Sequence, residues 1–238
     1  MEHIYLVAAV VFAATVVQSV SGFGFALVAM SILSLIMPMK TATPLVLLCG
    51  MLITFLIFLR LIRHLDISKF IPLLAGALFG VPFGAYVLVN ADETLVRRLL
   101  ALLLFLYSVY SLTHTRSGRV ISRNWGFLFG FLSGCFGSAF NYSGPPVIVY
   151  TSMQNWDKDD IVVTMQSFFF ISGLAIVAVH ALNGLITTQV LASWALLSPV
   201  LFLGVFAGSR LYEKIDQDLF RRILFLLLIL LSLVIAIK

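Results

Sequence analysis

Charged residues are scarce in this sequence. Only 11% of its 238 residues are Asp, Glu, Lys or Arg, whereas 61% are hydrophobic and the mean hydropathy is +1.11. Too few polar side chains remain to cover the surface of a soluble protein of this length. The composition therefore excludes a soluble globular domain and predicts an integral membrane protein whose main surroundings are the lipid bilayer.

Cysteines and buried acids are also lacking. Cys49 and Cys135 are the only cysteines, and both lie in apolar runs without the His or Cys neighbours of a metal site, so neither a disulfide framework nor a metal site is expected. All 10 Asp and Glu residues fall in loops or at the ends of apolar runs. No acid is thus available inside the membrane as a proton relay or a cation site. With no HExxH motif either, we expect no enzyme, no catalytic residue and no cofactor.

Long uncharged runs take up most of the chain: 4–39, 41–59, 70–91, 99–115, 124–156, 161–209 and 223–237. A helix that crosses a membrane needs roughly 20 apolar residues, so most of these runs are single spans. The run 161–209 is too long for one span, and Asn183-Gly184 predicts a turn that divides it. The sequence therefore predicts an all-α polytopic membrane protein with eight hydrophobic units.

An internal repeat relates the two halves of the chain at a constant offset of 124 residues. The residues Gly80, Gly84, Asp92, Leu95 and Arg97-Arg98 recur as Gly204, Gly208, Asp216, Leu219 and Arg221-Arg222. Glycines at four-residue spacing in membrane helices permit close helix contact, and we expect this role for both pairs. The predicted organisation is a first membrane repeat over 1–113, a basic cytoplasmic linker over 114–123 and a second membrane repeat over 124–238.

The charges in the loops distinguish a parallel repeat from an inverted one. If every unit crosses once, the 15 Lys and Arg residues divide seven to eight between the two sides. If 4–38 and 125–154 each enter and return, eleven face four, which is the bias expected of cytoplasmic loops. A straight helix over 4–38 would also span about 50 Å, against a hydrocarbon core of roughly 30 Å.

The loop charges thus favour two inverted repeats, each with a broken or re-entrant first helix followed by three transmembrane helices. The basic loops 60–69, 113–123 and 210–222 are then cytoplasmic. This topology also explains the net charge of +5, so no nucleic-acid partner is expected. The alternative of long tilted spans in a parallel repeat stays open. His64, His114 and His180 lie at the ends of spans, where we expect interfacial positions.

The two predicted helix breaks are the candidate binding site, because discontinuous helices expose backbone groups near the middle of the membrane. A helix that starts after Ser143 would direct the positive end of its dipole inward, which favours an anion. Gln166, in the next span, either completes the site or bonds to a neighbouring helix. The predicted substrate-binding residues are Gln18, Ser21, Gly22, Phe23, Gly24, Ser138, Asn141, Tyr142, Ser143, Gly144, Pro145 and Gln166.

Both breaks also carry a family resemblance. Residues 18–29, QSVSGFGFALVA, resemble the first signature of the TauE/SafE sulfite exporter family. Residues 137–150, GSAFNYSGPPVIVY, resemble its second signature, and 166–169 resemble the polar-then-Phe pattern of the following span. The resemblance covers nearly the whole chain and implies transport of sulfite, sulfoacetate, taurine-derived sulfonates or related anions across the bacterial inner membrane. Two departures affect the pocket: Ser138 stands where Gly is frequent, and Tyr142 where a smaller residue is common.

The resulting hypothesis is a secondary transporter that moves a small sulfur-containing anion by alternating access. Neutral donors and helix ends would hold the anion. An anion channel and a transporter of a different small anion are the alternatives, with an intramembrane enzyme and a structural subunit behind them. The expected partners are the small anionic substrate and the lipid bilayer, and the sequence is compatible with a homo-oligomer.

Overall fold

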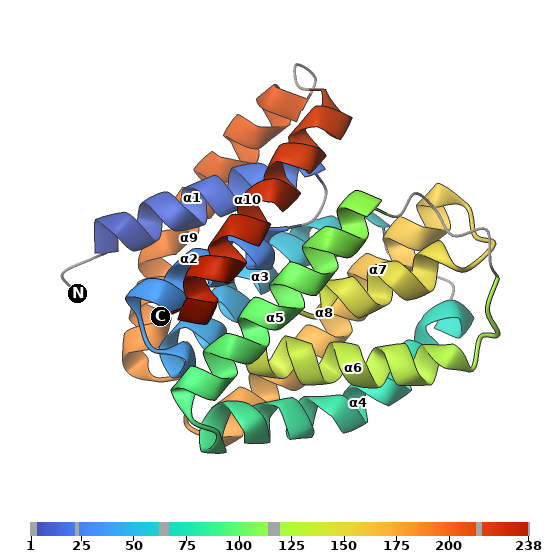
Figure 1. Ribbon diagram of the computed structural model, residues 1–238, viewed down its shortest axis with the longest axis horizontal. Coiled ribbons are helices and arrows are strands. Elements are labelled where there is room, and N and C mark those ends of the chain that lie inside the picture. Colours follow the sequence, from blue (N-terminus) through green and yellow to red (C-terminus); the bar gives the residue numbers. More distant parts are fainter. Residues whose placement is uncertain (1–3, 22–23, 62–66, 114–119, 213–215, 238) are drawn as a thin grey trace. The chain divides into compact units, whose positions relative to one another are not determined.

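The computed structural model describes residues 4–21, 24–61, 67–113, 120–212 and 216–237. Every helix or strand in these residues is an α-helix, and there are ten of them (Figure 1). In chain order they are α1 (Ile4–Ser21), α2 (Phe25–Ile36), α3 (Met39–Leu61), α4 (Ile67–Asn90), α5 (Glu93–Thr113), α6 (Trp125–Phe140), α7 (Gly144–Ser152), α8 (Lys158–Leu182), α9 (Thr188–Tyr212) and α10 (Gln217–Ile237).

The eight predicted hydrophobic units become ten helices because two units are each divided once. The first unit divides into α1 and α2 before Gly24, which has a φ of 107°. The run around 125–154 divides into α6 and α7 at Asn141. The predicted turn at Asn183-Gly184 is confirmed, since α8 ends at Leu182 and Gly184 has a φ of 69°.

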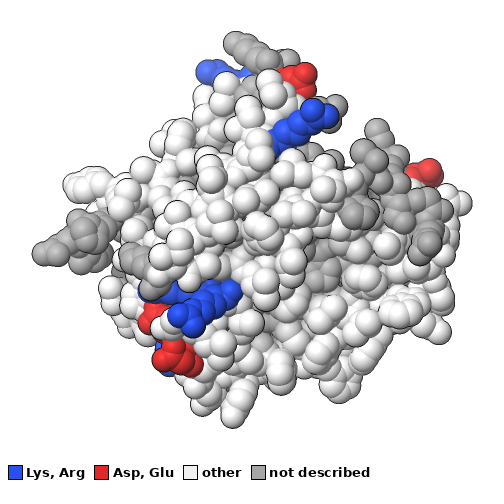
Figure 2. All heavy atoms as spheres, in the orientation of Figure 1, with Lys and Arg blue, Asp and Glu red and all other residues white. Residues whose placement is uncertain are grey.

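Four helical stretches in the described part of the chain are long and apolar enough to cross a membrane: Ser68–Asn90, Glu93–Thr113, Val163–Leu182 and Thr188–Leu211. The outer face of α4 illustrates their surroundings, since Phe79, Phe83 and Tyr86 are 68%, 58% and 66% exposed. Most of the molecular face drawn in Figure 2 is uncharged as well. Such a surface suits lipid rather than water.

The chain forms two compact units, which are described one at a time. Unit 1 comprises Met1–Cys49, Asp92–Thr115 and Thr187–Lys238. Unit 2 comprises Gly50–Ala91 and Arg116–Ile186. Each unit thus combines helices from both halves of the sequence. The division into repeats 1–113 and 124–238 is a different one, and it stays a prediction.

In unit 2, glycines let α4 and α6 approach until their backbones touch. A Cβ atom on Gly80 would lie 2.1 Å from the carbonyl oxygen of Phe131, and one on Gly84 would lie 2.2 Å from that of Cys135. In return, a Cβ atom on Gly130 of α6 would lie 2.0 Å from the carbonyl oxygen of Leu73. The predicted packing role of Gly80 and Gly84 is confirmed. Because the contacts advance along both helices together, α4 and α6 run parallel.

In unit 1, the second glycine pair packs α9 against α1. A Cβ atom on Gly204 would lie 2.7 Å from Cβ of Thr15, and one on Gly208 would lie 2.5 Å from Cβ of Ser19. These two helices also run parallel. The predicted packing role of this pair is confirmed too. In both units, the helix with the glycine pair therefore packs on the broken first helix of the other half.

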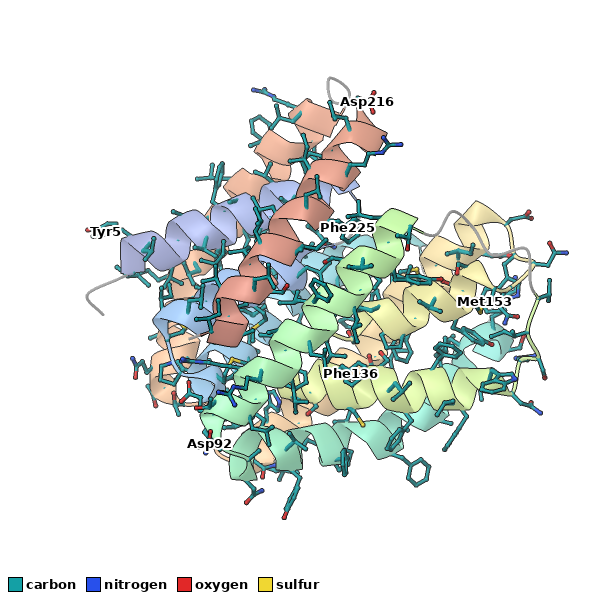
Figure 3. The ribbon with its side chains drawn as sticks, viewed as in Figure 1. Tyr5, Asp92, Phe136, Met153, Asp216 and Phe225 are labelled. Atoms are coloured by element: carbon teal, nitrogen blue, oxygen red, sulfur yellow. The ribbon has the colours of Figure 1, made fainter. Side chains whose placement is uncertain are left out.

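The repeated aspartates begin equivalent helices, as Figure 3 shows for Asp92 and Asp216. Oδ1 of Asp92 accepts hydrogen bonds from the Thr94 N–H at 2.8 Å and the Leu95 N–H at 3.4 Å, at the start of α5. Oδ1 of Asp216 accepts one from the Leu219 N–H at 3.0 Å, at the start of α10. Both are N-caps. The Thr94 hydrogen bonds, chiefly, lower the pKa of Asp92 below its usual value.

Candidate functional site

Helices α6 and α7 form a hairpin whose two ends meet. The ring of Phe129 on α6 lies 5.8 Å from that of Tyr150 on α7. The N–H of Ile121, before α6, donates to the carbonyl oxygen of Met153, after α7, at 3.1 Å. Nε2 of Gln154 donates back to the carbonyl oxygen of Ile121 at 3.3 Å. The chain therefore turns back within this segment, and the residue after α7 lies beside the residue before α6. Figure 3 labels Phe136 on α6 and Met153 at the end of α7.

The starts of α4, α6 and α8 lie at one end of unit 2. Lys69 of α4 forms an ion pair with Asp160 of α8 and lies 5.7 Å from the centre of the Trp156 ring. That ring is 6.0 Å from Tyr150, whose hydroxyl donates to the carbonyl oxygen of Arg123 before α6 at 3.3 Å. Because these three helices start at the same end, they run in the same direction, and the chain returns to that end between α6 and α8.

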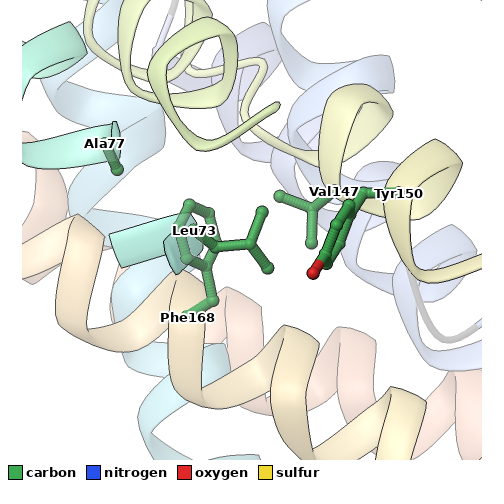
Figure 4. Close-up of a cluster of buried hydrophobic side chains, with 5 residues drawn as sticks. All are labelled: Leu73, Ala77, Val147, Tyr150 and Phe168. Atoms are coloured by element: carbon green, nitrogen blue, oxygen red, sulfur yellow. The ribbon is translucent and has the colours of Figure 1, made fainter. Parts of the chain in front are cut away.

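A buried apolar cluster fixes α7 in this hairpin. Val147 and Tyr150 of α7 pack with Leu73 and Ala77 of α4 and with Phe168 of α8, and all five side chains are fully buried (Figure 4). Burial of large apolar side chains contributes roughly 1.5–3 kcal/mol each in water-soluble proteins, and within a bilayer the tight packing itself provides the gain. The short helix is thereby held on two neighbouring helices.

A left-handed residue separates α6 from α7. Asn141 has φ 56° and ψ 33°, a conformation that Asn adopts more readily than most residues. Its N–H donates to the carbonyl oxygen of Gly137 at 2.8 Å, and the N–H of Tyr142 donates to that of Phe136 at 3.1 Å. The end of α6 is thus closed by backbone hydrogen bonds, and α7 starts at Gly144.

The start of α7 offers few backbone donors. Pro145 and Pro146 have no N–H, so Gly144 has the only N–H among the first three residues of the helix. Ser143 stands at the N-cap, yet its hydroxyl makes no capping hydrogen bond. The helix dipole still favours an anion at this end. Further donors at this end are side chains, and the nearest in the chain are those of Ser143, Tyr142 and Asn141.

Ser133 ties the turn to α6, although sequence reasoning did not select it for the site. Its hydroxyl is buried and donates to the carbonyl oxygen of Ser143 at 2.7 Å. Gly137 allows the same close approach, since a Cβ atom there would lie 3.0 Å from Cβ of Ser143 and 3.1 Å from Cδ1 of Ile176 on α8. The turn is therefore packed tightly against α6, and the same part of α6 lies close to α8.

His180 is the second residue that sequence reasoning missed. An interfacial position was expected, but its side chain is completely buried. Its Nε2 lies 2.8 Å from the carbonyl oxygen of Ser138 and 3.5 Å from Oγ of the same residue. The last turn of α6 covers the histidine, so its place near the end of a span does not expose it. His180 is thus in direct contact with a predicted site residue.

Gln166 lies far from His180 along α8. Its side chain is 7% exposed, on the same helix as His180, and α8 rises about 21 Å between the two residues. Gln166 is close in sequence to Phe168, which packs against Val147 and Tyr150 of α7. Gln166 is therefore far from His180 along α8, and it lies on the stretch of α8 that packs against α7.

The first helix break lies in unit 1. Oε1 of Gln18 accepts a hydrogen bond from the N–H of Phe25 at 2.9 Å, so Gln18 caps α2 across the break. Gly24 precedes α2 with a φ that L-residues rarely adopt, and Ser21 is the last residue of α1. Gly22 and Phe23 lie outside the described residues. The two breaks belong to different compact units, and each is described by itself.

Metal ligands are not gathered in the part of the chain that the structure describes. No group of three or more His, Cys, Asp or Glu side chains is found there, and both cysteines are buried free thiols. The polar groups around the α6–α7 turn are hydroxyls, amides and one imidazole. Such groups can bind an oxyanion by hydrogen bonds.

Comparison with known proteins identifies a family for this chain. The sequence model of the family described as "Sulfite exporter TauE/SafE" matches residues 6–235, which is almost the whole chain. No curated protein and no solved structure matched.

Proposed function

Because this chain belongs to the TauE/SafE sulfite exporter family, whose members are membrane transporters of sulfur anions and not enzymes, we propose that it carries sulfite or an organosulfonate across the membrane. The observation that carries this proposal is the break between α6 and α7. There, the left-handed Asn141, the start of α7 and the buried Ser138 converge in a hairpin that returns to its starting level. Dipole and hydrogen-bond donors together favour a small anion.

The proposed binding residues form two clusters. One comprises Gln18, Ser21, Gly22, Phe23 and Gly24 at the first break, and the other comprises Ser138, Asn141, Tyr142, Ser143, Gly144 and Pro145 at the second. A sulfonate presents three oxygen acceptors, which hydroxyl, amide and backbone N–H donors can satisfy without a formal positive charge. We assign Gln166 to the path of the anion rather than to the turn, because α8 separates it from His180 by about 21 Å.

The topology that we propose is an inverted repeat with both first units re-entrant. The common end of α4, α6 and α8 in unit 2 supports it, since Lys69 and Arg123 lie at that end. The equivalent glycine packing of α4 on α6 and of α9 on α1 supports a duplicated module. Eleven of the 15 Lys and Arg residues then face the cytoplasm, and the protein resides in the bacterial inner membrane. Transport proceeds by alternating access, as one repeat moves against the other.

An anion channel would use the same donors, and flux measurements separate it from a carrier. A carrier saturates with substrate because its rate is set by a conformational step, whereas a channel passes current without such a limit. If the purified protein produces single-channel currents in planar bilayers, it is a channel and the carrier proposal is wrong.

Ligand-dependent thermal stability tests the substrate class. Purified protein in detergent is heated with sulfite, thiosulfate, taurine, sulfoacetate or sulfur-free carboxylates. A ligand that binds only the folded state raises the apparent melting temperature by mass action. We expect a rise with sulfur oxyanions, and a response to the carboxylates alone would remove the sulfur assignment.

The variant Asn141→Gly tests the site, because Gly keeps the left-handed backbone and removes only the amide. Loss of a hydrogen bond to a charged ligand costs about 1.5–3 kcal/mol, which corresponds to a roughly 10- to 150-fold weaker affinity. The matched control is Asn183→Gly, at the end of α8, where the exposed amide donates only to Val179 of its own helix. If the ligand raises the melting temperature equally in both variants, Asn141 does not take part in binding.

A further inference from the structure

We propose that His180 is the proton-binding residue of this transporter, so that a proton crosses the membrane together with the anion. The proton comes from water on the side where the anion enters, binds the lone pair of Nδ1 and leaves to water on the other side. No other bond forms or breaks. The inference rests on the proposed function, because it concerns the coupling of the same anion site.

The protonation state of His180 follows from its hydrogen bond. A carbonyl oxygen can only accept, so Nε2 must carry the hydrogen that it shares with the oxygen of Ser138 at 2.8 Å. In a neutral imidazole the other nitrogen, Nδ1, then has a free lone pair. This Nδ1 atom is buried and has no hydrogen-bond partner among the residues that the structure describes.

An unpaired buried acceptor is rare and costs free energy, which indicates a role besides packing. Protonation of Nδ1 would turn it into a donor, but a lone imidazolium buried among apolar side chains is also unfavourable. A bound anion removes this second cost by supplying the opposite charge. Proton and anion binding therefore favour each other, and the linkage is reciprocal.

The location of His180 suits this coupling. Its partner Ser138 belongs to the last turn of α6, one turn before Asn141, and the Ser138 hydroxyl lies 3.5 Å from Nε2. The imidazole therefore contacts α6 one helical turn before the break at which the proposed anion site lies. No Asp or Glu occupies this part of the sequence, and the turn itself contributes one titratable side chain, the phenol of Tyr142. An imidazole, unlike a phenol, can bind a proton near neutral pH, so His180 is the better suited of the two.

The other titratable groups around α8 are not suited to bind the proton in place of His180. The helices packed against α8 contribute four: Lys69 and Tyr86 of α4, Cys135 of α6 and Tyr150 of α7. Lys69 is paired with Asp160, about 30 Å along α8 from His180, and Tyr150 is held near Trp156 at the same end. Tyr86 is 66% exposed, and the Cys135 thiol is buried. Residues 50–55 of α3, which face Gly173 and Phe170, and the turn 183–187 contain no titratable side chain.

The test uses the full chain in proteoliposomes with a pH-sensitive dye inside and labelled thiosulfate outside. Thiosulfate keeps its charge between about pH 5 and pH 8, the range in which histidine titrates, so an internal pH change reports protons moved by the protein. We expect the wild type to acidify the interior as thiosulfate enters. Uptake should fall up to about tenfold per pH unit where His180 is mostly neutral.

The variant His180→Gln keeps an N–H donor for Ser138 but cannot bind a proton at neutral pH. We expect it to lose thiosulfate-driven acidification and the pH dependence of any remaining uptake. His114→Gln, in the linker, is the matched control and should behave as the wild type. Acidification that persists in His180→Gln, or wild-type uptake without acidification, would overturn the inference and leave the proposed function intact. Absence of uptake for every sulfur anion would overturn the proposed function instead.

A second measurement covers the case in which His180→Gln does not fold. The chain has 4 histidines, so ¹⁵N-labelled histidine gives few NMR signals, and Gln variants of the other three identify that of His180. We expect Nδ1 of His180 to change from a lone-pair to an N–H chemical shift when thiosulfate is added to the wild type. An unchanged Nδ1 signal in the presence of bound thiosulfate would contradict the proposal.

Discussion

At the scale of single residues, replacing Gly80 by Ala has two opposing effects on stability. In Gly80→Ala, the helix propensity of Ala favours the variant by about 1 kcal/mol. The added Cβ atom would lie 2.1 Å from the carbonyl oxygen of Phe131, and backbone cannot move aside as a flexible side chain can. Overpacking costs about 1–3 kcal/mol, and displacement of a whole helix belongs at the upper end of that range. We expect an apparent melting temperature a few degrees below that of the wild type.

Leu78→Ala provides the control for this prediction, since Leu78 lies on the same helix and is 52% exposed. Lipid tails are as apolar as leucine, so truncation of a lipid-facing side chain changes stability little. Thermal unfolding in detergent, followed by intrinsic fluorescence, compares both variants with the wild type. A Gly80→Ala protein that melts at or above the wild-type temperature would show that α4 and α6 are not in backbone contact.

The residues that sequence reasoning identified are those whose role is local. Asn141 and Gly184 mark helix ends because their own backbone conformations require it, and a Gly pair at four-residue spacing indicates a helix contact whatever the partner is. The role of His180 could not be predicted, because the last turn of α6 covers it, and that contact joins distant parts of the chain. Ser133 was missed for a different reason, because a lone serine in a membrane helix usually serves packing.

At the scale of elements, Gln18 connects the start of α2 with the proposed binding of the anion. Gln18→Glu keeps an oxygen that can accept from the Phe25 N–H, and its charge suits the start of a helix. The same charge repels an anion. We expect a melting temperature close to that of the wild type, together with loss of the ligand-induced rise.

Gln18→Ala separates the two roles of this residue. It removes the cap, at a cost of about 1 kcal/mol, without adding charge. We expect it to be less stable than Gln18→Glu but to retain a weakened ligand response. If Gln18→Glu responds to sulfur anions as strongly as the wild type does, Gln18 only caps α2 and takes no part in binding.

The α6–α7 hairpin makes a prediction about membrane sides. Ser122 and Asn155 are exposed and flank the hairpin, whose ends are joined by the hydrogen bond between Ile121 and Met153. In a Cys49→Ala, Cys135→Ala background, we expect Ser122→Cys and Asn155→Cys to react with an impermeant thiol reagent from the same side of the membrane. Asn90→Cys, at the far end of α4, should react from the other side. Labelling of Ser122→Cys and Asn155→Cys from opposite sides would mean that the segment crosses once.

At the scale of the whole molecule, the halves of the sequence exchange helices. Helix α4 of the first half packs on α6 of the second, and α9 of the second half packs on α1 of the first. Composition and repeat pattern predicted an all-helical membrane protein with two related halves, because apolar runs and repeated motifs are visible along the chain. The partner of each helix was not predictable, because helix pairing depends on surface shape between segments that are far apart in sequence. The exchange implies that neither half completes its packing alone.

The repeat offset gives the last prediction, because it supplies a pair of matched positions. Asn90 is exposed at the end of α4, and the position 124 residues later in the sequence is Lys214, outside the described residues. In an inverted repeat, equivalent positions face opposite sides of the membrane, whereas a parallel repeat places them on the same side. We expect Asn90→Cys and Lys214→Cys, each in the cysteine-free background, to be labelled from opposite sides, with Lys214→Cys on the cytoplasmic side. Asp92→Cys and Asp216→Cys repeat the test at the helix caps. Labelling of both pairs from the same side would establish a parallel repeat. The alternating-access proposal would then lose the inverted architecture on which it depends.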